Sequence, residues 1–168
     1  MLDARQADAG QVERFFGQPP VERVERLYSI SEVKRSARIR DMVRRLEIGD
    51  LTFDTGSASL SPDQFGALNS VAEAMLQLLQ QNPAETFLIE GHTDAVGSDA
   101  GNLVLSDARA ATVAGILSDS FQVPPENLAT QGYGAHFLKV QTDGPEQLNR
   151  RVVVRRITPL VTVAASNQ

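Results

Sequence analysis

Two oppositely charged residues, Asp94 and Arg109, are the best candidates for chemistry in this sequence. The apolar run 86–89 predicts a strand, the segment 91–98 predicts a glycine-punctuated loop, and a helical pattern begins near residues 99–102. Asp94 then lies just past the strand, and Arg109 about two turns into the helix. We expect both groups to face one small cavity, because α/β proteins place their ligands in the loops at the carboxyl ends of strands.

A carboxylate and a guanidinium in one cavity suit a zwitterionic amino-acid group. Arg109 offers a planar fork that can hold a carboxylate through two parallel hydrogen bonds, and Asp94 can accept from an ammonium. An alternative is that the two residues form a purely structural ion pair, which the spacing alone favours. A catalytic alternative pairs Asp94 with Glu90, although a nearby Arg109 would keep Asp94 ionised.

The composition limits the classes of function. The chain has 168 residues, 42% of them hydrophobic, with no Cys and only His92 and His136 as histidines. We therefore predict no catalytic residues, no metal and no cofactor. Residues 1–50 hold ten Lys and Arg against nine Asp and Glu, whereas residues 51–168 hold six against twelve. The acidic second part argues against nucleic acid as a partner.

The hydrophobic patterns predict the element order β-α-β-α-β-β. Two long amphipathic helices against one small sheet indicate an α/β (α+β) two-layer sandwich. The last strand alternates charged residues with Val152 and Val154, which predicts one solvated face. Strands are expected at residues 47–54, 86–89, 128–133 and 150–157, and helices at 61–81 and 99–120.

The two ends of the chain have different patterns. A helix is expected over residues 31–45, capped by Ser31 and rich in Lys and Arg. Its basic side chains either meet an anionic surface, such as lipid headgroups or wall carboxylates, or form the solvated face of a helix docked on the acidic domain. The chain is expected to divide into a flexible tail or linker (1–20), a helical extension (21–45), the main domain (46–157) and a C-terminal tail (158–168).

The motifs of the main domain are similar to a known family. Gly91 to Asp94 read GHTD, and Asn102 to Val113 follow the pattern N-x-x-L-S-x-x-R-A-x-x-V. Together with Gly132-Tyr133-Gly134 and Asn149-Arg150-Arg151, these motifs resemble the OmpA-like peptidoglycan-binding domain family over about residues 46–157. The resemblance implies a mixed sheet with both helices on one face.

The resemblance also implies a function and a set of site residues. It implies non-covalent binding of peptidoglycan through the meso-diaminopimelate of its stem peptide, in the Gram-negative cell envelope. Asp94 and Arg109 would contact the diaminopimelate, and the other residues expected to line the pocket are Thr55, Asn102, Leu105 (through its backbone) and Arg150. His92 is expected to pack beside the site. The loop after Gly134 lacks the Glu and Pro of many members, so no contact from it is carried over.

Three functions follow as hypotheses. The first is a non-catalytic periplasmic module that anchors an envelope protein to the cell wall. The second is a ligand-free protein-interaction domain that docks through the helix at 31–45, and the third, less supported, is a cell-wall hydrolase. No segment approaches the roughly 18 apolar residues of a membrane span. The start of the chain also lacks a signal-peptide core. We therefore expect an upstream targeting segment to link the full-length protein to the membrane or outer membrane.

Overall fold

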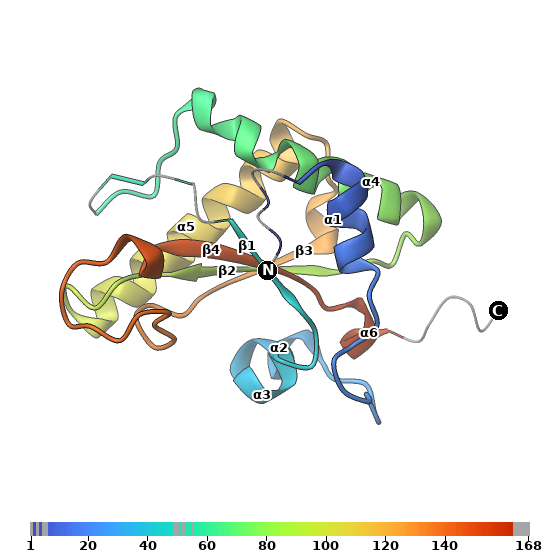
Figure 1. Cartoon of the computed structure of the whole chain (residues 1–168), viewed down its shortest axis with the longest axis horizontal. Coiled ribbons are helices and arrows are strands. Elements are labelled where there is room, and N and C mark those ends of the chain that lie inside the picture. The colour runs from blue at the N-terminus through green and yellow to red at the C-terminus, as the bar shows by residue number, and fades with distance from the viewer. Residues whose placement is uncertain are drawn as a thin grey trace.

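The computed structural model describes residues 2, 4, 7–48, 51, 53, 54 and 56–162. These residues form a mixed four-stranded sheet in the order β1-β4-β2-β3 (Figure 1). β2 pairs with β3 in parallel, and β4 lies antiparallel between β1 and β2. The strands are β1 (Arg45–Ile48), β2 (Phe87–His92), β3 (Leu128–Gly132) and β4 (Arg151–Arg156).

Two long helices cover one face of this sheet, as predicted. A 3-10 turn, Pro62–Leu68, leads into α4 (Asn69–Gln81), and α5 (Asp99–Asp119) lies against β2 and β3. Successive strand residues point to opposite faces, so Phe87 and Ile89 of β2 join the core under these helices. The predicted β-α-β-α-β-β order and the α+β class are confirmed.

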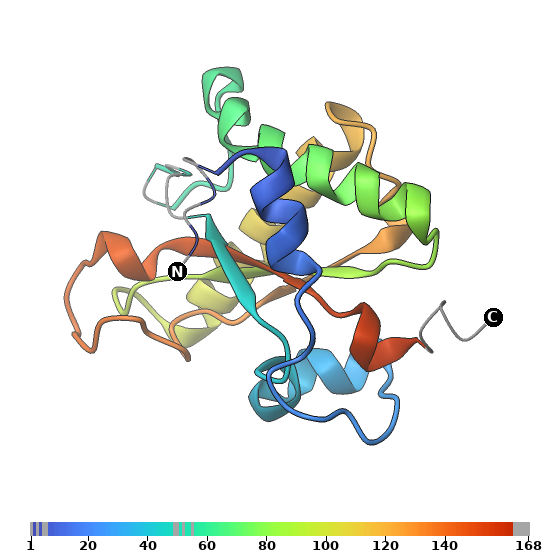
Figure 2. The same ribbon diagram turned by 45° about the vertical axis from the view of Figure 1, so that its right-hand side comes forward.

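A third helix, α1 (Ala9–Phe16), packs beside α4 on the same face (Figures 1 and 2). The polar composition of residues 1–20 predicts a tail or linker, and that prediction is wrong for residues 9–16. Val12 and Phe16 are buried, and the Phe16 ring meets the Phe87 ring edge to face with centroids 5.4 Å apart. Asp8 and Gln11 close a reciprocal capping box at the start of the helix.

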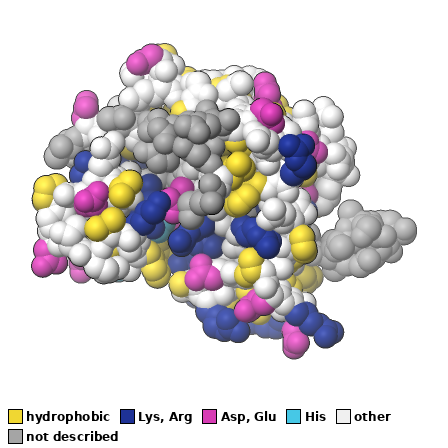
Figure 3. All heavy atoms as spheres, in the orientation of Figure 1, with side chains coloured by type: hydrophobic (Ala, Val, Ile, Leu, Met, Phe, Trp, Pro, Cys, Tyr) yellow, Lys and Arg dark blue, Asp and Glu magenta, His cyan; other side chains and the backbone are white. Residues whose placement is uncertain are grey.

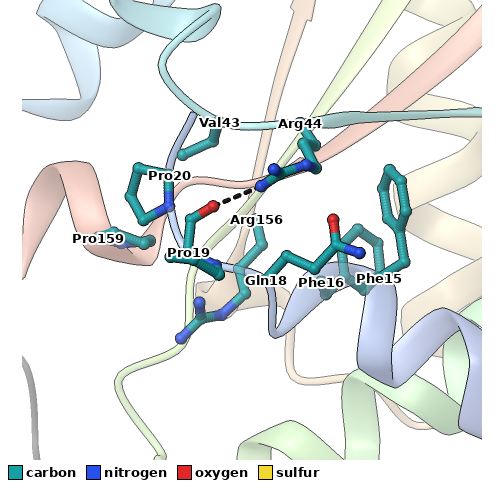
Figure 4. A pocket seen from close by; sticks show the side chains of 9 residues that line it. All are labelled: Phe15, Phe16, Gln18, Pro19, Pro20, Val43, Arg44, Arg156 and Pro159. Atoms are coloured by element: carbon teal, nitrogen blue, oxygen red, sulfur yellow. Dashed lines mark hydrogen bonds between the residues drawn. The ribbon is translucent and has the colours of Figure 1, made fainter. Parts of the chain in front are cut away.

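After α1 the chain crosses to the other face of the sheet. Figures 1 and 2 show this crossing, and Figure 4 shows the side chains along it, where Arg44 donates a hydrogen bond to the Pro19 carbonyl near Phe16 and Arg156. The Val21 amide then donates to the Met42 carbonyl at 2.8 Å. Residues 19–21 are thereby hydrogen-bonded to residues 42–44, directly before the edge strand β1.

The opposite face is covered by short helices. The expected helix over 31–45 is instead α2 (Ile30–Arg35) and α3 (Ala37–Arg40), followed by β1. The helix breaks because Ser36 is extended, with φ −123° and ψ 111°, and its side chain caps α3. The cap of α2 is Ser29 rather than Ser31.

The C-terminal end also contributes to this second layer. α6 (Thr158–Val161) replaces the start of the predicted tail, and Leu160 is fully buried among the side chains of the second layer. The Tyr28 amide donates to the Leu160 carbonyl at 2.8 Å, which joins the extension to α6. The rest of the predicted tail, residues 163–168, lies outside the described residues.

The covering of both faces corrects the prediction for β4. Its alternating pattern predicts one solvated face, yet both faces of β4 are buried. Arg155 is only 5% exposed. It pairs with Glu90 of β2 and donates to the carbonyls of Arg40 and Val43. Buried charges are tolerated when they are paired and hydrogen-bonded in this way.

Candidate ligand-binding site

An open pocket of about 1000 Å³ lies where the loop after β2 meets the first turns of α5. It contains five of the six predicted site residues, namely Asp94, Asn102, Leu105, Arg109 and Arg150. The sixth, Thr55, lies outside the described residues, while its neighbour Gly56 lines the pocket. The structure therefore brings together residues that are far apart in the sequence.

Two glycines allow α5 to press against the ends of β2 and β3. A Cβ added at Gly91 would lie 2.0 Å from the Ser106 carbonyl oxygen, and one at Gly132 would lie 2.2 Å from the Asp107 backbone nitrogen. Ser106 in turn accepts a hydrogen bond from the Gly134 amide at 2.9 Å. This close approach sets the distance between α5, which carries Arg109, and the loop that carries Asp94.

Asp94 is buried, with 8% of its surface exposed, and its carboxylate is well bonded. One oxygen accepts from the Val96 amide at 3.2 Å. The other accepts from Arg150 Nη1 at 2.6 Å and from the Glu146 amide at 3.4 Å. The ion pair at this site therefore joins Asp94 to Arg150, which the spacing of the sequence did not show.

Arg109 is held separately, by the loop between β1 and the first 3-10 turn. Its Nε donates to the Ser57 carbonyl at 3.0 Å and its Nη2 to the Asp54 carbonyl at 3.2 Å. The guanidinium also lies over the Phe53 ring, 4.9 Å from the centroid. Burial lowers the pKa of Arg109, the positive charge of Arg150 lowers it further, and Asp94 opposes the shift. An anionic ligand would stabilise the charged guanidinium and so offset the hydration that Arg109 loses on burial.

Asn102 shapes the loop that carries Asp94. Its side-chain amide donates to the Val96 carbonyl at 3.1 Å and to the Asp94 carbonyl at 3.5 Å. Gly97, in the same loop, has a φ of +97°, which favours glycine. Leu105 is half-buried at the pocket wall. Asn102 is thus committed to the loop backbone, and its contribution to the site is to hold Asp94 in place.

The catalytic alternative is not supported by the position of Glu90. This side chain is 1% exposed on the opposite face of the sheet, bonded to His92 Nε2 at 3.1 Å and paired with Arg155. The hypothesis that Glu90 and Asp94 form a carboxylate pair is therefore wrong. His92 stacks on Tyr133 with ring centroids 5.6 Å apart, which agrees with the packing role predicted for it.

Residues 135–140, directly after Gly134, do not line the pocket. Lys139 Nζ bonds Glu47 at 2.6 Å, and the buried Asn149 accepts from the Lys139 and Val140 amides. Pro145 and Arg150 line this side of the pocket instead. Within the described ranges, no group of three or more His, Cys, Asp or Glu side chains is placed to hold a metal ion.

Fold and site together define an α+β domain whose mixed sheet is covered on both faces, rather than the predicted two-layer sandwich, with a pocket that contains opposite charges. The family model described as "OmpA family" matches residues 52–151. The chain belongs to the OmpA family.

Individual relatives agree with this assignment. Outer membrane porin F of Pseudomonas fluorescens is 33% identical over 112 residues, which cover 66% of this chain and 32% of the porin. The peptidoglycan-associated lipoprotein from Burkholderia pseudomallei superposes with a TM-score of 0.51 at 24% identity, over 69% of this chain and 92% of that one. The OmpA-like domain of FopA1 from Francisella tularensis gives a TM-score of 0.52 at 18% identity, over 67% and 72% of the two chains.

The relatives found by sequence are considerably longer than this chain. It spans about a third of the P. fluorescens porin and 23% of outer membrane protein P5 of Haemophilus influenzae. Across the part of the chain that the structure describes, none of the helices combines the length and the apolar character that a membrane crossing requires.

Proposed function

We propose that this domain binds peptidoglycan non-covalently through the diaminopimelate of its stem peptide, and so anchors an envelope protein to the cell wall. One observation carries the proposal: Asp94 and Arg109 line one open pocket, yet their recorded hydrogen bonds go to other partners. Two buried, opposite charges at one pocket are complementary to a ligand group that carries both signs.

The free end of diaminopimelate is such a group. Its carboxylate would meet the Arg109 guanidinium, whose position is set by the carbonyls of Ser57 and Asp54. Its ammonium would meet the Asp94 carboxylate, in exchange for Arg150. The Arg150 side chain is 36% exposed, and Arg150 precedes β4, so the side chain can leave Asp94 for solvent or for the ligand carboxylate without unfolding the strand. Charge-assisted bonds of this kind are about twice as strong as neutral ones.

The relatives support the general setting of this proposal. One solved neighbour is named a peptidoglycan-associated lipoprotein, and several sequence relatives are named outer membrane proteins. A periplasmic location at the outer membrane, with attachment through a segment outside this chain, is part of the proposal. An envelope protein that carries this domain is its expected partner.

Co-sedimentation with purified diaminopimelate-type sacculi tests the proposal. Asp94→Ala and Arg109→Ala are expected to remain folded and to stay in the supernatant, because truncating one partner of a charged contact costs about 2–5 kcal/mol. Asp119→Ala and Arg14→Ala are matched controls, since both residues are exposed and neither lines the pocket. Circular dichroism of each variant checks folding.

Three results would overturn the proposal. The first is sedimentation of all variants to the same extent, and the second is failure of the wild type to sediment. The third is equal binding to sacculi that contain lysine in place of diaminopimelate, which would remove the assigned ligand. Release of soluble muropeptides from the sacculi would favour the hydrolase instead.

A further inference from the structure

A second pocket, of about 310 Å³, lies between α2 and the loop after β3, next to Leu103 in the first turns of α5. This volume is at the lower end of the range for small-molecule sites. Basic and aromatic side chains dominate its lining. The lining residues are Lys34, Arg35, Arg40, Leu103, Gln131, Gly132, Tyr133, His136 and Phe137.

The base of this pocket contains a buried arginine, Arg40, whose Nε makes no hydrogen bond among the described residues. Arg40 is 2% exposed, and its Nη1 donates to the carbonyls of Val33 and Lys34 at 3.2 and 2.7 Å. Its Nε has no hydrogen-bond partner among the described residues, and Glu90 Oε2 is 3.9 Å away. Arg40 therefore places a buried positive charge at the base of the pocket, with Glu90 as its ion-pair partner.

The base of the pocket is rigidly built. The Arg40 guanidinium lies over the Tyr133 ring at 4.1 Å and over the Phe137 ring at 5.3 Å. The Tyr133 hydroxyl donates to the Lys34 carbonyl at 2.7 Å, so α2 and the loop after β3 are bonded to each other. A ligand would thus meet a preformed surface, which reduces the entropy lost on binding.

The walls supply positive charge and an apolar surface. Lys34 and Arg35 form the last turn of α2, and Figure 3 shows Lys and Arg side chains gathered over the α2–α3 end of the molecule. The Phe137 side chain is 41% exposed, unlike most aromatic side chains in the chain. The carboxylates nearby are engaged: Glu90 pairs with Arg155 and His92, and Asp107 accepts from the Gly132 amide.

We propose that this pocket binds a small organic anion, with a phosphate or carboxylate group on Lys34 and Arg35 above the buried charge of Arg40, and a non-polar ring on Phe137. Cations and aromatic faces at one site favour a ligand with both an anionic and an apolar part. α2, which supplies Lys34 and Arg35, lies outside the residues matched by the family model. The site shares no lining residue with the pocket at Asp94 and is separate from it.

A titration of the ¹⁵N-labelled full chain, followed by NMR, tests this site. The probes are phenyl phosphate, benzoate, inorganic phosphate and the neutral benzyl alcohol. Phenyl phosphate or benzoate is expected to shift the amides of Leu103, Gly132 and Phe137 in a saturable way, with weaker binding of inorganic phosphate and none of benzyl alcohol. The stronger of the two aromatic anions identifies the preferred head group.

Variants then assign the binding to named side chains. Lys34→Ala with Arg35→Ala is expected to weaken binding at least about tenfold, since each removes a charged contact. Arg23→Ala with Arg38→Ala is the matched control, because both residues are exposed on the same extension outside the pocket. Asp94→Ala is expected to bind the probe normally, so failure of the wall-binding proposal leaves this one standing.

The proposal is overturned if neither aromatic anion gives saturable shifts at these amides. It is also overturned if the Lys34 and Arg35 double variant binds as tightly as the control. Equal affinity for benzyl alcohol would show that the pocket recognises only the ring. Equal affinity for inorganic phosphate would show that the ring makes no contact, and either result contradicts the assigned ligand class.

Discussion

Replacing Phe16 by alanine tests whether α1 belongs to the core. Phe16 is 4% exposed and packs edge to face on Phe87, a fully buried residue of β2. Removing a buried Phe side chain typically costs 3–5 kcal/mol, through lost burial and the cavity left behind. Because whole domains are stable by only about 5–15 kcal/mol, this loss should be plainly visible.

Urea denaturation followed by circular dichroism measures the effect. Phe16→Ala is expected to lower the free energy of unfolding by about 3–5 kcal/mol, with an unchanged m-value. Val21→Ala is the control, because Val21 is 54% exposed and should change stability by less than about 0.5 kcal/mol. A loss below about 1 kcal/mol for Phe16→Ala would refute the docking of α1, since exposed positions behave that way.

Three further predictions concern the sheet and the site. Burial lowers the pKa of His92 despite its bond to Glu90, so the unfolded chain takes up a proton at a higher pH than the folded one. The free energy of unfolding should therefore fall as the pH is lowered from about 7 to about 5. Urea titrations at each pH should show a shallower decline for a His92→Gln variant. Gly132→Ala places a Cβ 2.2 Å from the Asp107 backbone nitrogen, so a melting temperature lower by several degrees is expected, and an unchanged one would contradict the close approach of α5. Arg109→Lys keeps the charge but loses the planar fork, so sedimentation with sacculi should drop at least about tenfold, whereas full retention would show that charge alone suffices.

Much of the fold was predictable because the long amphipathic elements carry strong periodicity. The stripe of α4, the apolar run that begins β2 and the glycine-containing loop before α5 each indicate their structure locally. The ends of the chain were less predictable because their elements are short. α1 buries only Val12 and Phe16, too few apolar residues for a clear period, and α2 and α3 are interrupted at Ser36.

Five residues that line the candidate site could be predicted from the sequence. Asp94 and Arg109 follow from residue type and spacing, and the motifs around them added Asn102, Leu105 and Arg150, all of which line the pocket. Asp94, Asn102, Leu105 and Arg109 are separated along the chain only by a loop and helical turns of regular geometry, which local patterns describe well.

The pairing of the charges depends on contacts between residues that are distant in the sequence. Asp94 bonds Arg150, which is 56 residues away, and Glu90 is removed from the site because it pairs with Arg155 across the sheet. The second pocket likewise exists only because Arg40 and Tyr133 meet across long stretches of chain. Strand order and the covering of each face set these distances, and both depend on which buried surfaces fit together rather than on any local pattern.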